Sequence, residues 1–245
     1  MPLHVLGTDV PAMTTSGPGS TNARQSVADD RLALHLMALG FGIGSLLFAA
    51  GALLAVAGSD LANPVFAVGA VGFTSAAFVQ WRTAVHHGMH GIKQRAEFDL
   101  TNPDWTSAVT QLIGTLYFNV MTIRALSVTL ADASDYNHEV WRPDVFGSTL
   151  FLVSSLIALH PVARERRHHL VPKRAWRIAL SNLFGSVLFA VSAIGALAIG
   201  TDTLLSDALN NLSTFLGALG FLAASVLTWP PAASRGAGPT ATDSP

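Results

Sequence analysis

The sequence predicts an all-α membrane protein with six transmembrane helices, built as three related helical hairpins. Half of its 245 residues are hydrophobic and only 12% are charged, whereas about 25% of the residues of an average soluble domain are charged. In addition, a Gly-small-x-x-Phe pattern, with another small residue four positions after the Phe, occurs once in each of six apolar stretches. The glycine and phenylalanine positions are Gly44 and Phe48, Gly69 and Phe73, Gly114 and Phe118, Gly147 and Phe151, Gly185 and Phe189, and Gly217 and Phe221.

This pattern predicts how the helices pack. Positions i, i+4 and i+8 of a helix form one stripe, so each stretch presents a glycine notch beside a phenylalanine side chain. Membrane helices associate where small residues let their backbones approach each other. Gly44, Gly114 and Gly185 are 70 and 71 residues apart, and Gly147 and Gly217 are 70 apart. This spacing indicates an internal repeat of three hairpins, which are predicted over residues 31–81, 105–160 and 178–229.

Composition and motifs limit the chemistry that the chain can perform. The absence of cysteine removes disulfides, thiolate metal sites and cysteine nucleophiles, and a net charge of -1 gives no indication of nucleic-acid binding. The sequence has no Gly-x-Ser-x-Gly, no phosphate-binding glycine loop and no His-Glu-x-x-His. We therefore predict a protein without enzymatic activity, with no catalytic residues and no cofactor.

The first hairpin follows a polar tail. Residues 1–30 are rich in Thr, Ser, Gly, Pro and Asp and lack the apolar core of a signal peptide, so they are predicted to be a disordered cytoplasmic tail. The first span is predicted over 32–58. The pair Asn63 and Pro64 then provides an N-cap and a proline at the first helical position of a second span, which ends near residue 81.

The second hairpin follows a polar cytoplasmic loop at 82–104 and is the most polar of the three. Its third span is predicted at about 106–130, and its fourth begins after Pro143 and ends at His160. Polar side chains in these spans either hydrogen-bond between helices or line a solute pathway. The candidates are Gln111, Asn119, Thr122, Arg124, Ser148 and Ser155.

Arg124 is the one charged residue predicted inside a span. A charge at the centre of a membrane helix costs about 2.5–3.5 kcal/mol, so it should be paired or reach the interface. One interpretation is a substrate or anion contact that faces the bundle interior. The other is an interfacial arginine that pairs with the acidic outer loop, at Asp132, Glu139 or Asp144.

The third hairpin follows a basic cytoplasmic loop at 161–177, which contains six Lys and Arg residues. Such a cluster attracts anionic lipid headgroups by about 1 kcal/mol for each basic residue. The fifth span is predicted at about 178–200 and the sixth at about 209–229. Residues 230–245 are predicted to form a disordered tail.

The distribution of basic residues predicts the orientation. The N-terminal tail, the two polar loops and the C-terminal tail hold two, three, six and one Lys or Arg, whereas the three remaining loops hold only Arg142. The positive-inside rule therefore places both termini in the cytoplasm. All five tryptophans fall at predicted span ends, where their amphipathic rings favour the membrane interface.

Histidines near the cytoplasmic ends of the spans offer an alternative. His86 and His90 are four residues apart and would share one helical face, a spacing that suits two imidazoles on one metal ion. His160 lies at the cytoplasmic end of the fourth span. A haem or metal site formed by these histidines is thus a further hypothesis.

The second hairpin resembles a known family. The run Gly147 to Phe151 reads Gly-Ser-Thr-Leu-Phe and is followed by Pro161 and basic residues from Arg164. It resembles the second helix of YrhK-like domains, which are small bacterial membrane hairpins with a Gly-Ser-x-x-Phe signature. Residues 114–118 match the first helix, with Thr115 in place of Ser, so the resemblance covers about residues 107–167. It implies a membrane hairpin and, because the family has no established activity, no site residues.

These observations together predict a multi-pass protein of the bacterial inner membrane that acts as a structural or accessory component. One alternative is a small-solute or ion transporter that uses the polar second hairpin, and another is a haem- or metal-binding membrane protein. The expected partners are the lipid bilayer, a second copy of the chain or another membrane protein.

Overall fold

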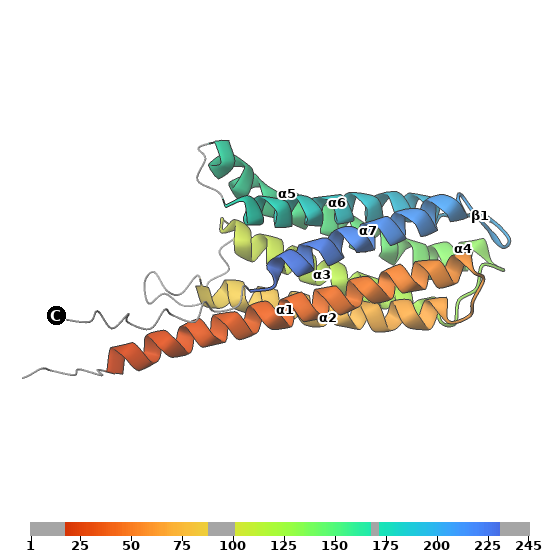
Figure 1. Ribbon diagram of the computed structural model, residues 1–245. Helices are drawn as coiled ribbons and strands as arrows, with labels where there is room; N and C mark the ends of the chain where they lie inside the picture. The colour runs from red at the N-terminus through yellow and green to blue at the C-terminus, as the bar shows by residue number, and fades with distance from the viewer. Residues whose placement is uncertain (1–17, 88–100, 168–171, 231–245) are drawn as a thin grey trace, which may run out of the picture.

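The computed structural model describes residues 18–87, 101–167 and 172–230, and these are almost entirely helical (Figure 1). The prediction of an all-α fold is confirmed. The helices are α1 (Pro18–Val56), α2 (Ala62–His87), α3 (Pro103–Arg124), α4 (Ala133–Tyr136), the π-helical turn η1 (Asn137–Trp141), α5 (Arg142–Arg167), α6 (Lys173–Gly195) and α7 (Asp207–Thr228). Two short strands, β1 (Ala198–Gly200) and β2 (Thr203–Leu204), pair between α6 and α7.

The six long helices form a closed ring. Each packs on its two neighbours in the order α1, α2, α3, α5, α6 and α7, and α7 packs back on α1. Figure 1 shows the helices running side by side, with the start of α1 and the end of α7 at the same end of the bundle. Within the described ranges, five helical segments are long and apolar enough to cross a membrane: 28–56, 62–85, 133–167, 173–195 and 207–228.

Helix α3 is the ring member that is absent from those five. It has 22 residues, a length comparable to α6 and α7, but a more polar composition. Its polar side chains are turned toward neighbouring helices, since Gln111 is 7% exposed, Thr115 0% and Thr122 1%. The polar side chains of α3 therefore lie where it contacts other helices. They do not form a solvent-exposed face.

Several predicted boundaries are wrong because the helices extend beyond the apolar stretches. Helix α1 begins at Pro18, so residues 18–30 are helical rather than disordered, while residues 1–17 lie outside the described part. Once a helix is nucleated, each added residue forms another hydrogen bond, and charged or polar residues can continue it into water.

The same extension shortens the predicted cytoplasmic loops. Helix α2 continues to His87, and α5 continues through Pro161 to Arg167, so part of the predicted basic loop is helical. Conversely, α3 ends at Arg124, before the predicted end of the third span at residue 130. The chain then turns, and the next helical segment already begins at Ala133 rather than after Pro143.

The core of the ring consists of the six phenylalanines of the repeated pattern, all at most 3% exposed. They form two triangles across the axis of the ring, in each of which the ring centroids lie 5.6–6.1 Å apart. One triangle is Phe48, Phe118 and Phe189, and the other is Phe73, Phe151 and Phe221. The two triangles also contact each other, because each of the pairs α1–α2, α3–α5 and α6–α7 provides one phenylalanine to each triangle. The ring centroids within these pairs are 4.9–5.4 Å apart.

The glycines of the pattern allow this arrangement. In each of the three helix pairs the two glycines face each other, and a Cβ atom added to either would lie 2.9–3.2 Å from the carbonyl oxygen of the other. The added atom would also lie 2.6–3.2 Å from the phenylalanine ring of the partner helix. Each glycine thus receives the phenylalanine of its partner, and no larger residue fits at these positions without displacing that ring.

Candidate functional site

Three of the six polar candidates of the second hairpin, Gln111, Asn119 and Ser155, form hydrogen bonds to another helix. The Ser154 hydroxyl on α5 donates to the Ser107 carbonyl at 2.8 Å and lies 3.2 Å from Gln111 Oε1 on α3. The hydroxyls of Ser155 on α5 and Ser186 on α6 are 2.7 Å apart. These contacts join α3 to α5 and α5 to α6.

Two further contacts join α3 to α2 and α7 to α1. Asn119 on α3 donates from Nδ2 to the Thr74 hydroxyl on α2. The Ser225 hydroxyl on α7 donates to the Ala38 carbonyl on α1 at 2.5 Å. Thr122 donates to the Phe118 carbonyl of its own helix at 2.8 Å. The structure therefore does not assemble the sequence-predicted polar residues into one pathway.

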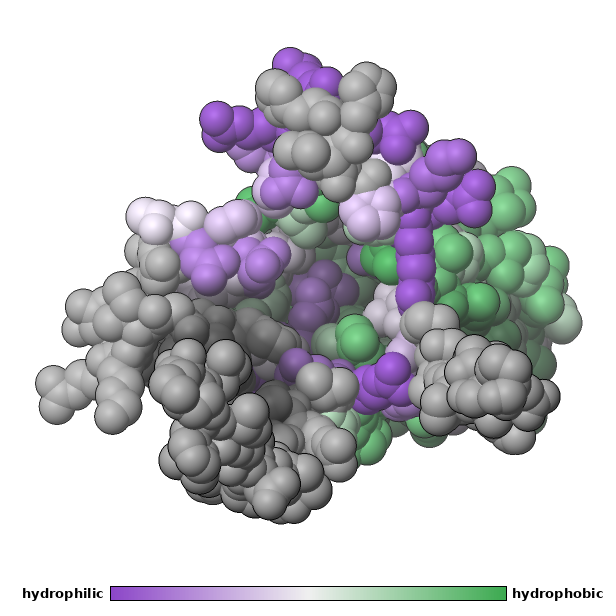
Figure 2. All heavy atoms as spheres, turned by 60° about the vertical axis from the view of Figure 1, so that its left-hand side comes forward, coloured by the Kyte–Doolittle hydropathy of each residue, from purple (hydrophilic) through white to green (hydrophobic). Residues whose placement is uncertain are grey.

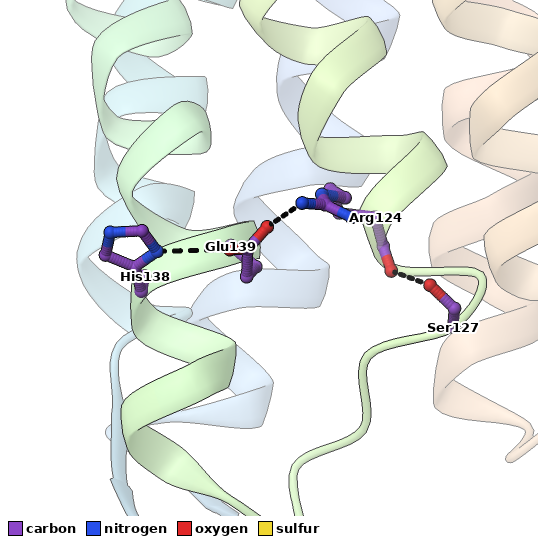
Figure 3. A network of polar contacts seen from close by, with 4 residues as sticks. All are labelled: Arg124, Ser127, His138 and Glu139. Carbon is purple, nitrogen blue, oxygen red and sulfur yellow. Dashed lines mark hydrogen bonds and ion pairs between the residues drawn. The ribbon is translucent and has the colours of Figure 1, made fainter.

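Arg124 pairs with Glu139 of η1 and not with a residue in the bundle interior (Figure 3). Its guanidinium lies 2.5 Å from a Glu139 carboxylate oxygen, and its side chain is 52% exposed. The other carboxylate oxygen of Glu139 lies 3.2 Å from Nδ1 of His138, and the Ser127 hydroxyl donates to the Arg124 carbonyl at 3.3 Å. Of the three acidic partners expected for Arg124, the structure shows an ion pair with Glu139.

A cavity of about 110 Å³ lies inside the ring, at the end where β1 and β2 connect α6 to α7. Its floor is the phenylalanine triangle of Phe48, Phe118 and Phe189. Aromatic side chains from Phe66, Tyr136 and Trp141 contribute to its lining. Polar lining comes from Asn63, Asp144, Ser192, Asn210, Asn211 and Thr214. All six long helices, together with α4 and η1, thus contribute to one partly polar space above the aromatic core.

The π-helical turn η1 lies between two residues that line the cavity, Tyr136 and Asp144. Asn137 exchanges two hydrogen bonds with Ala198 of β1, donating from Nδ2 at 2.8 Å and accepting at Oδ1 at 2.9 Å. Trp141 donates from Nε1 to the Ala193 carbonyl of α6 at 2.9 Å. Single π-helical turns inside helices occur frequently at functional sites. Here the turn fixes the register in which Tyr136 and Asp144 reach the cavity.

The opposite wall is held by hydrogen bonds between α6 and α7. The Ser192 hydroxyl lies 2.8 Å from Asn210 Oδ1 and 2.6 Å from the Thr214 hydroxyl. From α2, Asn63 donates from Nδ2 to the Ala125 carbonyl at 2.8 Å. These bonds fix the positions of polar side chains that line the cavity.

Asp144 is the residue that sequence reasoning placed wrongly. The sequence predicts Asp144 near the start of the fourth span, as one candidate partner for Arg124. It predicts no acidic residue in the interior of a span. In the structure the helical segment begins at Ala133, so Asp144 lies eleven residues into it and lines the cavity. Its Oδ1 atom lies 3.4 Å from the Ser148 hydroxyl, one helical turn away. The i to i+4 spacing of Asp144 and Ser148 is the sequence feature that indicates this contact.

The predicted histidine site is only partly described. His160 is exposed near the end of α5, and His86 lies in the last turn of α2. His90 lies outside the described residues. Across 18–87, 101–167 and 172–230 there is no group of three or more side chains suited to hold a metal ion.

No protein-family model, no curated protein and no solved structure matches the chain. Its function is therefore argued from the geometry of the ring and of the cavity.

Proposed function

We propose that this protein is a non-enzymatic structural or accessory component of the bacterial inner membrane, with six spans arranged as three hairpins and both termini in the cytoplasm. The observation that carries the proposal is the double triangle of phenylalanines, which fills the axis of the ring. A channel needs a water-filled path, whereas stacked aromatic rings leave no polar route through the centre. A tightly interlocked ring of this kind suits a stable membrane-embedded platform.

The proposal takes α3 as the sixth span. Its 22 residues at 1.5 Å per residue give about 33 Å, enough for a hydrocarbon layer of about 30 Å. Because α3 packs between α2 and α5, a ring lying in the bilayer requires α3 to cross it as well. The buried polar side chains of α3 are hydrogen-bonded to neighbours, which lowers the cost of placing them in lipid.

The transporter alternative loses its main support. Of the residues that would line a pathway in the second hairpin, Gln111, Asn119 and Ser155 form hydrogen bonds to other helices. Thr122 and Ser148 bond within their own helices, and Arg124 forms a largely exposed ion pair. The haem or metal hypothesis gains no supporting observation. The YrhK-like resemblance over residues 107–167 stays a prediction and agrees with the proposed hairpin of α3 and α5.

Lipid contacts are proposed at the basic end of the ring. Arg164, Arg166 and Arg167 are exposed in the last turns of α5. Figure 2 shows hydrophilic residues gathered at the top of the molecule, where α5 ends and α6 begins, beside a hydrophobic flank. The Arg166 guanidinium lies 4.7 Å from the centre of the Trp176 ring, an arrangement typical of a membrane interface. Anionic headgroups are the partner that this surface fits.

The topology is tested by cysteine labelling, for which a chain without cysteine is an ideal background. Single substitutions Asp60→Cys, Ser127→Cys and Thr201→Cys lie in exposed turns at the cavity end. We expect a membrane-impermeant maleimide to label all three on intact cells and to label Glu165→Cys only after permeabilisation. Labelling of Ser127→Cys and Asp60→Cys from opposite sides would exclude α3 as a span.

The platform role is tested by reconstitution. We expect proteoliposomes that contain the wild-type protein to show no greater ion or small-solute flux than empty liposomes. A flux that Gln111→Ala and Arg124→Ala abolish without loss of folding would overturn the structural role and restore the transporter.

A further inference from the structure

We propose that the cavity above the phenylalanine floor binds a small organic ammonium ion, with Asp144 as its counter-charge. The inference goes beyond the structural role, because a platform needs no internal polar cavity. It rests on the charge of the lining, the nature of its walls and its volume.

The charge of the lining determines the sign of the ligand. Among the described residues that line the cavity, Asp144 is the only charged side chain, and none is Lys, Arg or His. No basic side chain of the described part forms an ion pair with Asp144, since Arg124 is paired with Glu139. Arg142, two residues before Asp144, is exposed. Asp144 is partly buried, and a carboxylate that is partly removed from water favours a cation that supplies the missing charge.

The contacts of Asp144 with the protein leave room for that cation. Its one hydrogen bond among the described residues is to Ser148, at 3.4 Å, near the upper limit for such a bond. A carboxylate has about four acceptor sites in its two oxygens. Its remaining acceptor capacity can therefore be used by the N–H groups of a bound ammonium or by direct charge contact with a quaternary one.

The walls favour an organic cation over a metal ion. The rings of Phe48, Phe118 and Phe189 form the floor, and those of Tyr136 and Trp141 contribute to the sides. Aromatic faces attract ammonium groups, and the attraction is stronger when the site is desolvated. Ca²⁺, by contrast, takes six to eight oxygen ligands, and Mg²⁺ six in an octahedron, whereas Asp144 supplies the only carboxylate among the described residues of this lining and the other side-chain oxygens are neutral.

The volume sets the size of the ligand. An engineered cavity of about 150 Å³ accepts benzene, so a cavity of about 110 Å³ suits a cation of about five non-hydrogen atoms. Tetramethylammonium has this size, and methylammonium is smaller. With the orientation proposed above, the ligand would enter from the non-cytoplasmic side, between the turns that join the helix pairs.

The experiment uses the full-length protein purified in mild detergent, with tetramethylammonium chloride as the probe. Binding is measured by isothermal titration calorimetry and by the shift of the unfolding temperature. tert-Butanol, which has a similar shape and no charge, and sodium chloride at equal ionic strength serve as comparisons. We expect saturable binding and stabilisation by tetramethylammonium and by neither comparison compound.

A pair of isosteric variants locates the site. We expect Asp144→Asn to weaken tetramethylammonium binding at least tenfold, about 1.4 kcal/mol. Asp60→Asn, which removes an exposed carboxylate at the same end of the bundle, should leave binding unchanged. If Asp144→Asn fails to fold, the binding of tetramethylammonium, tert-butanol and sodium to the wild-type protein still shows whether the cavity selects an organic cation.

Four results would overturn the inference: no binding of tetramethylammonium or methylammonium up to about 100 mM, equal binding of tert-butanol, equal stabilisation by sodium, or full binding by Asp144→Asn. The test is independent of the structural role, because a flux in proteoliposomes would refute that role and leave this binding result standing.

Discussion

Placing a branched side chain at a glycine notch should destabilise the whole ring. In Gly217→Val the new Cβ would lie 2.6 Å from Cδ1 of Phe189 and 3.0 Å from the Gly185 carbonyl oxygen. Neither can yield easily, because one is backbone and the other belongs to a buried aromatic triangle. Overpacking a core typically costs 1–3 kcal/mol. Valine and glycine have similar helix propensities, so this term adds little, and we expect a loss near the upper end, about 3 kcal/mol.

The measurement is thermal or denaturant unfolding in detergent. For a chain of this size 1 kcal/mol corresponds to about 2–4 °C, so Gly217→Val should lower the unfolding temperature by roughly 6–12 °C. Gly200→Val is the matched control, because a side chain added at Gly200 meets nothing within 4 Å. Adding Phe189→Leu to Gly217→Val should restore part of the loss. A Gly217→Val protein as stable as Gly200→Val would refute the notch-and-ring packing.

Three smaller effects follow from individual contacts. Ser155→Ala should lower the free energy of unfolding by about 1 kcal/mol, since it leaves Ser186 without its interhelical partner; an unchanged stability in chemical unfolding would contradict that contact. Trp141→Phe should lower the free energy of unfolding by about 0.5–1.5 kcal/mol, because it removes the hydrogen bond from Trp141 Nε1 to the Ala193 carbonyl. An unchanged free energy of unfolding would contradict this hydrogen bond. Arg124→Ala should cost less than about 1 kcal/mol because its ion pair is largely exposed, and a larger loss would indicate a buried role.

The sequence predicts the part of this fold that depends on local periodicity. A stripe at positions i, i+4 and i+8 shows which face of a helix meets another helix, whatever the partner. The all-α fold and the apolar segments follow from such local information. The spacing of about 70 residues also relates the three helix pairs.

The closed ring and its cavity depend on contacts between distant residues. The Ser225 hydroxyl meets the Ala38 carbonyl across 187 residues, and no local pattern indicates that pairing. Asp144 was missed for a related reason. Apolar composition places the start of the span after Pro143, whereas the helical segment begins at Ala133, where the Asp132 carboxylate accepts hydrogen bonds from the backbone N–H groups of Ser134 and Asp135. Asp144 therefore lies well inside this segment and lines the cavity.

Closure of the ring between α1 and α7 is the central structural claim, and an engineered disulfide tests it most directly. A Cβ added at Gly42 lies 3.8 Å from the Ser225 Cβ, which is the mean Cβ separation in disulfides, about 3.8 Å. In the cysteine-free chain, Gly42→Cys combined with Ser225→Cys should form an intramolecular disulfide on mild oxidation, seen by mass spectrometry of the linked peptides. Thr201→Cys with Ser225→Cys should not form one. A folded Gly42→Cys/Ser225→Cys protein that stays reduced under the same oxidation would contradict the closed ring.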